Sequence, residues 1–103
     1  MQEKVKKFNE DMPCHKKPMP VFARVLDIES EIGELAKESL KNSKYGTEGF
    51  VLNKDFEMEF GDVLYSLLSL ANECNINAES CLDMALEKYE NRIIKNKNMG
   101  SGK

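Results

Sequence analysis

Two short acidic motifs in this sequence have the residue types and the spacing of a metal site. Residues 31–35 read Glu-Ile-Gly-Glu-Leu, and residues 59–63 read Glu-Phe-Gly-Asp-Val. Each motif is an acid, a large apolar residue, a glycine, an acid and an aliphatic residue. An i,i+3 spacing places both acids of a motif on one face of a helix. If the two helices pack together, four carboxylates converge, and they repel one another unless they bind a cation or take up protons.

Carboxylate oxygens are ligands for a hard cation such as magnesium, manganese or calcium. Magnesium shares its coordination with water and substrate phosphates, so an acidic site and a phosphorylated ligand form a consistent pair. The residues alone therefore indicate a divalent cation of this class. A di-iron carboxylate bundle would require a Glu-x-x-His motif on two helices, and the sole histidine is His15, outside the expected helices. The expected ligands are Glu31, Glu34, Glu59 and Asp62.

A simpler interpretation is that these acids form solvated helix faces, which is the usual role of a single Glu-x-x-Glu pair. The repetition of the motif favours a functional site. Gly33 and Gly61 each cost about 1 kcal/mol relative to alanine inside a helix, so we expect another helix or a ligand to approach closely there. A zinc site is the weaker alternative because its candidate ligands match no zinc spacing, and we expect reduced thiols. Those candidates are Cys14, His15, Cys74 and Cys81.

Four helices are expected to position these residues, and no strand is convincing. Prolines at positions 13, 18 and 20 interrupt regular structure between the first two helices. A loop at residues 43–53, containing Gly46 and Gly49, separates the second helix from the third. Asn53 or Asp55 is the expected N-cap of the third helix, and Asn77 that of the fourth. The expected helices are Gln2 to Asp11, Pro20 to about Asn42, about Lys54 to Asn75, and Asn77 to about Asn96.

The two central helices each carry an apolar arc wider than the stripe of about 100° that a surface helix needs. We therefore predict an all-α fold, an antiparallel bundle of about four helices completed by oligomerisation. The acidic motifs lie at the edges of the arcs. One domain spans residues 1–103, with a core at 20–96 and a flexible tail at 98–103. The arc residues are Val21, Val25, Ile28, Ile32, Leu35 and Ala36, extended by Phe22 and Leu40, and then Phe56, Phe60, Val63, Leu64, Leu67, Leu68, Leu70 and Ala71.

Composition narrows the class of protein. A chain of 103 residues with 41% apolar and 32% charged residues suits a single globular domain. The net charge of −3 argues against a dedicated nucleic-acid binder. We expect no membrane association, because there is no run of about 18 apolar residues. The first residues lack the apolar segment of a secretory signal, so a cytoplasmic location is expected.

With these motifs in order, the chain resembles the MazG-like all-α nucleoside triphosphate pyrophosphohydrolase family. The family pattern is Glu-Glu-x-x-Glu on one helix and Glu-x-x-Asp on the next, followed by a basic signature. Here residues 30–34 read Ser-Glu-Ile-Gly-Glu, residues 59–62 read Glu-Phe-Gly-Asp, and residues 88–92 read Lys-Tyr-Glu-Asn-Arg. The resemblance covers about residues 21–94. Ser30 stands where the family pattern has its first acid, so this chain lacks that carboxylate.

The resemblance implies hydrolysis between the α and β phosphates of a (deoxy)nucleoside triphosphate, giving a monophosphate and pyrophosphate, in nucleotide-pool housekeeping. It implies Mg²⁺, with Mn²⁺ as a substitute, on the four acids, and Glu34 as the preferred general base. Lys88 and Arg92 would bind the leaving pyrophosphate, and Tyr45 and Lys54 are further candidate substrate contacts. The family typically forms dimers, or dimers of dimers, with the site near the chain interface.

Two alternatives stay open. One is a non-catalytic helical interaction or regulatory module that docks a basic partner through its acidic rim. The other keeps the metal and changes the substrate, as in a dimeric dUTPase-like enzyme or a phosphoribosyl-ATP hydrolase. The sequence does not specify the base, because base recognition depends on the loop at residues 43–53 and on a neighbouring chain.

Overall fold

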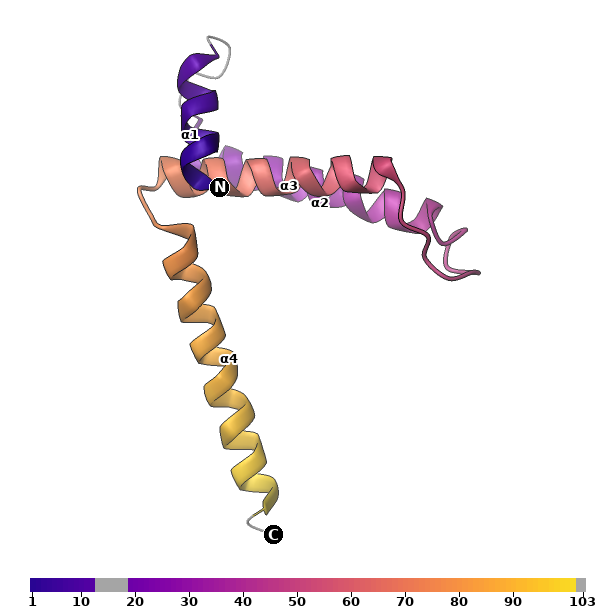
Figure 1. Ribbon diagram of the computed structural model, residues 1–103, viewed down its shortest axis with the longest axis vertical. Coiled ribbons are helices and arrows are strands. Elements are labelled where there is room, and N and C mark those ends of the chain that lie inside the picture. Colours follow the sequence, from indigo (N-terminus) through magenta and orange to yellow (C-terminus); the bar gives the residue numbers. More distant parts are fainter. Residues whose placement is uncertain (13–18, 102–103) are drawn as a thin grey trace.

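The computed structural model describes residues 1–12 and 19–101, with side chains described as far as residue 98. Within these ranges every regular element is a helix, which confirms the predicted all-α class (Figure 1). The elements are α1 (Gln2–Asp11), α2 (Val21–Lys41), α3 (Lys54–Glu73) and α4 (Ala78–Ser101).

Helices α2 and α3 lie side by side and form the body of the molecule (Figure 1). Near the start of α2, Arg24 forms a bidentate ion pair with Glu73 at the end of α3, with Nη2–Oε1 and Nε–Oε2 distances of 2.8 and 3.4 Å. At the other end of the pair, the side-chain amides of Asn42 and Asn53 donate to each other at 2.9 and 3.0 Å. The start of one helix therefore faces the end of the other, and the predicted antiparallel packing is confirmed.

The helix ends follow the capping residues. The Asn53 side chain accepts from the backbone N–H of Phe56 at 2.9 Å, and the Asn77 side chain accepts from that of Ser80 at 2.9 Å. Both predicted N-caps are thus confirmed, and each satisfies a backbone donor that the first turn leaves unpaired. Helix α4 continues to Ser101, beyond its predicted end near Asn96. Flexibility of the tail stays a prediction.

The buried core of the single chain is small. Among the residues whose side chains are described, it consists of one residue of α2 and four residues of α3: Ile28, Ser66, Leu68, Ser69 and Ala71. Many members of the predicted apolar arcs are about half exposed or more, among them Val21, Phe22, Val25, Ile32, Leu40, Phe60 and Leu67. One chain therefore covers only part of the apolar surface that its sequence provides.

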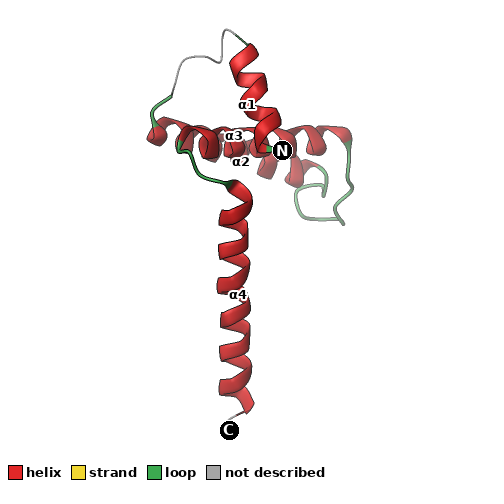
Figure 2. Cartoon of the chain, turned by 60° about the vertical axis from the view of Figure 1, so that its left-hand side comes forward, coloured by secondary structure: helices red, strands yellow, loops and turns green. Residues whose placement is uncertain are grey.

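Helix α4 extends away from the body, whereas α1 lies across α3 (Figures 1 and 2). Among the described residues, extensive packing joins α2 to α3 and α1 to α3. The large apolar residues of α4 are accordingly about half exposed or more: Leu82, Met84, Leu86, Tyr89, Ile93 and Ile94. Nowhere in the described part is a helix both long and apolar enough to cross a membrane.

Candidate metal centre

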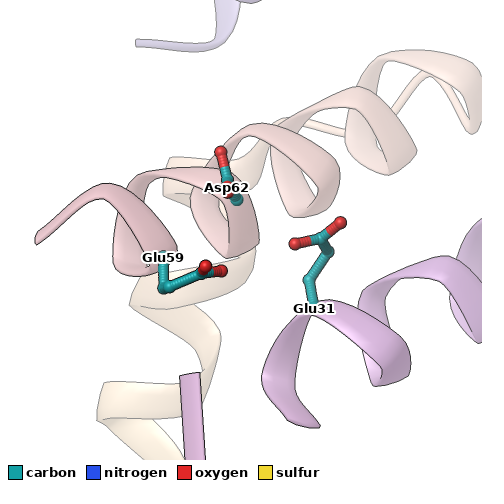
Figure 3. A group of neighbouring side chains, drawn as sticks. All are labelled: Glu31, Glu59 and Asp62. Atoms are coloured by element: carbon teal, nitrogen blue, oxygen red, sulfur yellow. The ribbon is translucent and has the colours of Figure 1, made fainter. Parts of the chain in front are cut away.

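Glu31 of α2 lies close to Glu59 and Asp62 of α3 (Figure 3). We call these three residues the acidic group. One carboxylate oxygen from each lies within 4.8 Å of those of the other two. Two oxygens bound on opposite sides of one hard cation are roughly 4 to 5 Å apart. The acidic group therefore has the dimensions of a single cation site.

The antiparallel register brings the acidic group together. One turn before Glu31, Asp27 accepts a hydrogen bond of 3.2 Å from the hydroxyl of Ser66, which lies one turn after Asp62. Ser66 is buried, with 3% of its surface exposed, so this bond satisfies a hydroxyl that would otherwise lack a partner. The bond links α2 to α3 beside the acidic group. Sequence reasoning missed both residues, although their i,i+4 spacing from Glu31 and Asp62 placed them on the same helix faces.

The pKa values of two members of the acidic group, Glu31 and Glu59, are raised. Reduced solvation raises the pKa of Glu31 most, followed by the charges of Asp62, Asp27 and Glu59. Reduced solvation also comes first in raising the pKa of Glu59, followed by the charges of Asp62 and Glu34. Each charged group that contributes to these two shifts is itself a carboxylate. Such a group gains from a bound cation, and its all-oxygen donor set fits magnesium, manganese or calcium.

Glu34 is not one of the three residues of the acidic group. It is exposed on α2, one turn beyond Glu31, and its charge contributes to raising the pKa values of Glu31 and Glu59. The structure therefore brings together three of the four predicted ligands. The roles of Glu34 as a ligand and as a general base stay predictions.

The predicted phosphate contacts Lys88 and Arg92 lie on α4, which carries them away from α2 and α3 (Figure 1). Both are exposed and approach the ring of Tyr89, with Lys88 Nζ 5.0 Å and Arg92 Cζ 5.9 Å from its centroid. These distances allow a cation–π interaction. Within one chain, the positively charged side chains of Lys88 and Arg92 therefore lie near each other and away from the acidic group.

The other two predicted substrate contacts lie at the loop end of the α2–α3 pair. Tyr45 is 75% exposed and adopts a left-handed backbone with φ 58°, in the turn that follows α2. Lys54 is the exposed first residue of α3. Neither belongs to the acidic group, and their roles in substrate binding stay predictions.

The two motif glycines face open space. A Cβ atom placed at Gly33 or Gly61 would meet nothing within 4 Å among the described residues. No other helix of the described chain therefore makes the predicted close approach, and approach by a ligand or a second chain stays a prediction. For the weaker zinc alternative, Cys14 and His15 lie outside the described residues, and Cys74 and Cys81 are free, exposed thiols.

Neutralising one member of the acidic group should stabilise the metal-free protein. Because the pKa of Glu31 in the folded state lies above its ordinary value of 4.5, the folded protein holds more protons across the range between the two values. The free energy of unfolding therefore falls as pH rises through that range. We expect Glu31→Gln to raise Tm at pH 7 without metal by about 1–2 °C and to remove the part of the fall in stability that Glu31 causes as pH rises above 4.5.

The measurement is thermal unfolding in a chelating buffer. Glu29→Gln removes an exposed charge from the same helix outside the acidic group and should leave Tm nearly unchanged. A lower Tm for metal-free Glu31→Gln than for the wild type would contradict the mutual repulsion of these carboxylates.

The fold and the acidic group together define an all-α protein with a carboxylate cluster between two antiparallel helices. Residues 23–95 match the model of the MazG nucleotide pyrophosphohydrolase domain. The chain belongs to this family, which confirms the predicted resemblance.

Two known proteins illustrate the relationship. The uncharacterized protein YpjD of Bacillus subtilis (strain 168) is 36% identical over 78 residues, covering 73% of this chain and 66% of YpjD. The chain thus spans slightly less than two thirds of that relative's length. The crystal structure of the Bacillus-conserved MazG protein, a nucleotide pyrophosphohydrolase, is similar with a TM-score of 0.70 at 27% identity, covering 86% of this chain and 84% of the other.

Proposed function

We propose that this chain is a magnesium-dependent pyrophosphohydrolase that cleaves a (deoxy)nucleoside triphosphate between its α and β phosphates, in nucleotide-pool housekeeping in the cytoplasm. The observation that carries the proposal is the convergence of Glu31, Glu59 and Asp62 from two helices, with oxygens within 4.8 Å. Membership of the MazG nucleotide pyrophosphohydrolase domain family supports the reaction type.

Glu31, Glu59 and Asp62 would hold the metal, and Glu34 lies on the next turn of α2. Bound magnesium supplies positive charge to the phosphate oxygens and makes water more acidic. Glu34 is exposed beside the acidic group and accepts a proton from the attacking water in this proposal.

The proposed enzyme is a homodimer or homotetramer. The apolar surfaces of α2, α3 and α4 are about half exposed in one chain, and burial of such surfaces stabilises association. Lys88 and Arg92 lie on α4, which extends away from α2 and α3 of its own chain. In this proposal α4 packs against a second chain. In the assembly these cations bind the phosphates that become pyrophosphate.

A panel of canonical and modified (deoxy)nucleoside triphosphates tests the proposal. With magnesium, at least one should yield monophosphate and pyrophosphate in equal amounts, detected by chromatography and by phosphate release after added pyrophosphatase. A chelator should abolish the reaction. Release of orthophosphate and diphosphate instead would contradict cleavage between the α and β phosphates, and inactivity towards the whole panel would contradict the proposal.

The second candidate is a non-catalytic module that docks a basic protein, and the exposed position of Asp62 and Glu34 at the rim favours it. Thermal unfolding with and without magnesium separates the two. A site present only in the folded state stabilises it by RT ln(1 + [Mg²⁺]/Kd), or about 2.7 kcal/mol at 100 times Kd. We expect Tm to rise with millimolar magnesium, and to rise much less in Asp62→Asn. No change with magnesium plus a non-hydrolysable nucleotide would favour the docking module.

A further inference from the structure

One side chain of α1 is hydrogen-bonded to both sides of the connection between α3 and α4. The Gln2 amide nitrogen donates to the backbone carbonyl of Ile76 at 2.7 Å, and its amide oxygen accepts from the backbone N–H of Ala78 at 2.9 Å. Ile76 lies in the connection, and Ala78 is the first residue of α4. Gln2 therefore bridges the point at which the chain changes direction.

Local interactions fix each side of this connection separately. Helix α3 ends with Asn75 in the left-handed region, with φ 55°, and Ile76 N–H donates to the carbonyl of Ala71 at 3.0 Å. This is a Schellman ending, in which both residues belong to the end of α3. Asn77 caps α4 through Ser80 N–H. The short backbone segment between these two motifs then sets the direction of α4 relative to α3. The Gln2 side chain binds to backbone groups at this segment.

Gln2 is itself held to α3. The side-chain amide of Asn72 donates to the Gln2 backbone carbonyl at 3.2 Å. Further along α1, Asn9 donates to the hydroxyl of Ser69 at 3.1 Å and accepts from that of Tyr65. Ser69 is fully buried, so the contact with Asn9 satisfies an enclosed hydroxyl. Figure 2 shows α1 lying across α3, close to the start of α4. The bridge therefore links α4 to the body of the molecule.

We propose that Gln2 is a positioning residue that sets the direction of α4 and thereby the location of Lys88 and Arg92. Only α2–α3 and α1–α3 pack extensively among the described helices, so the connection and Gln2 hold α4 in place within the chain. Arg92 is roughly 20 Å along the helix from Ala78 at 1.5 Å per residue. A change of about 20° in helix direction would move it by about 7 Å. The consequence for catalysis rests on the proposed function, whereas the consequence for helix direction does not.

Distances between spin labels on α3 and α4 test the helix direction. The chain of residues 1–103, with its three cysteines replaced by serine, receives labels at positions 57 and 96 and is diluted with unlabelled protein to suppress signals between chains. Gln2→Leu keeps a side chain of similar length without hydrogen bonds, and Gln2→Glu keeps only the acceptor for Ala78 N–H. We expect a broadened or shifted distribution for Gln2→Leu and an intermediate one for Gln2→Glu. Glu3→Ala, at an exposed neighbour, should match the parent protein.

Circular dichroism of each variant verifies that the helices are still formed. Distance distributions that are unchanged in both Gln2 variants would overturn the proposal.

Enzyme kinetics test the consequence for catalysis. We expect Gln2→Leu to lower kcat/KM by about tenfold while magnesium affinity without nucleotide is retained, with partial recovery in Gln2→Glu. Equal loss of magnesium affinity would indicate general destabilisation and would contradict a positioning role. A shifted distribution with unchanged kcat/KM would overturn the link to Lys88 and Arg92. An inactive parent protein would refute the proposed function and leave the distance result to decide the role of Gln2 in helix direction.

Discussion

Replacing Asp62 with asparagine should lower kcat/KM by about a hundredfold to a thousandfold, because it removes one of three negative charges that face the cation site. Asparagine has almost the same size as aspartate and retains one oxygen. Asp62 is exposed at the rim, so its replacement should leave the packing of α3 unchanged. The measurement is steady-state pyrophosphate release at several magnesium concentrations, with circular dichroism to verify helical content.

The matched control for this variant is Glu29→Gln, which neutralises an exposed acid on α2 outside the acidic group. It should retain nearly all of the wild-type activity at every magnesium concentration. If Asp62→Asn turned over substrate at the same rate as this control, the assignment of Asp62 to the metal site would be wrong.

Glu34→Gln should lower kcat by about a hundredfold or more, which is the usual effect of removing a general base. Its expected signature differs from that of Asp62→Asn because Glu34 is outside the acidic group. We expect magnesium affinity measured without nucleotide to fall little in Glu34→Gln and strongly in Asp62→Asn. Calorimetric titration with magnesium and single-turnover kinetics give the two quantities separately.

A large loss of magnesium affinity in Glu34→Gln would show that Glu34 is a ligand and not primarily a base. A variant with normal kcat and normal affinity would remove Glu34 from the site altogether. The two results correct different parts of the assignment.

Local sequence signals were sufficient for the helices and for the acid-bearing faces. Asn53 and Asn77 marked helix starts because their side chains satisfy unpaired backbone donors, a rule that needs no tertiary information. The i,i+3 spacing likewise placed both acids of each motif on one face. The expected antiparallel packing then required only the apolar arcs and the single loop at residues 43–53 that joins the two helices.

The register between α2 and α3 could not be read from these local signals. The structure sets it through residues distant in sequence, including the Arg24–Glu73 ion pair and the Asp27–Ser66 hydrogen bond. This register places Glu31 with Asp62 and Glu59 and leaves Glu34 outside the group. Helical periodicity fixes which face a residue occupies, but it does not fix how far one helix slides along another.

The course of α4 was also beyond sequence reasoning. The predicted bundle of about four helices would pack α4 against the others, yet within one chain the large apolar residues of α4 are about half exposed or more, because α4 leaves the body at the connection bound by Gln2. An apolar helix face has the same pattern whether it packs against its own chain or another. The sequence alone therefore did not place Lys88 and Arg92 relative to the acids.

Diffraction from a crystal soaked in manganese, recorded at a wavelength where manganese scatters anomalously, tests the cation site most directly. We expect an anomalous peak from a manganese ion bound by carboxylate oxygens of Glu31, Glu59 and Asp62. Crystals of Asp62→Asn soaked in the same way should show no such peak. Well-ordered carboxylates pointing apart into solvent in every copy, with no peak between them, would contradict the metal site and the proposed reaction with it.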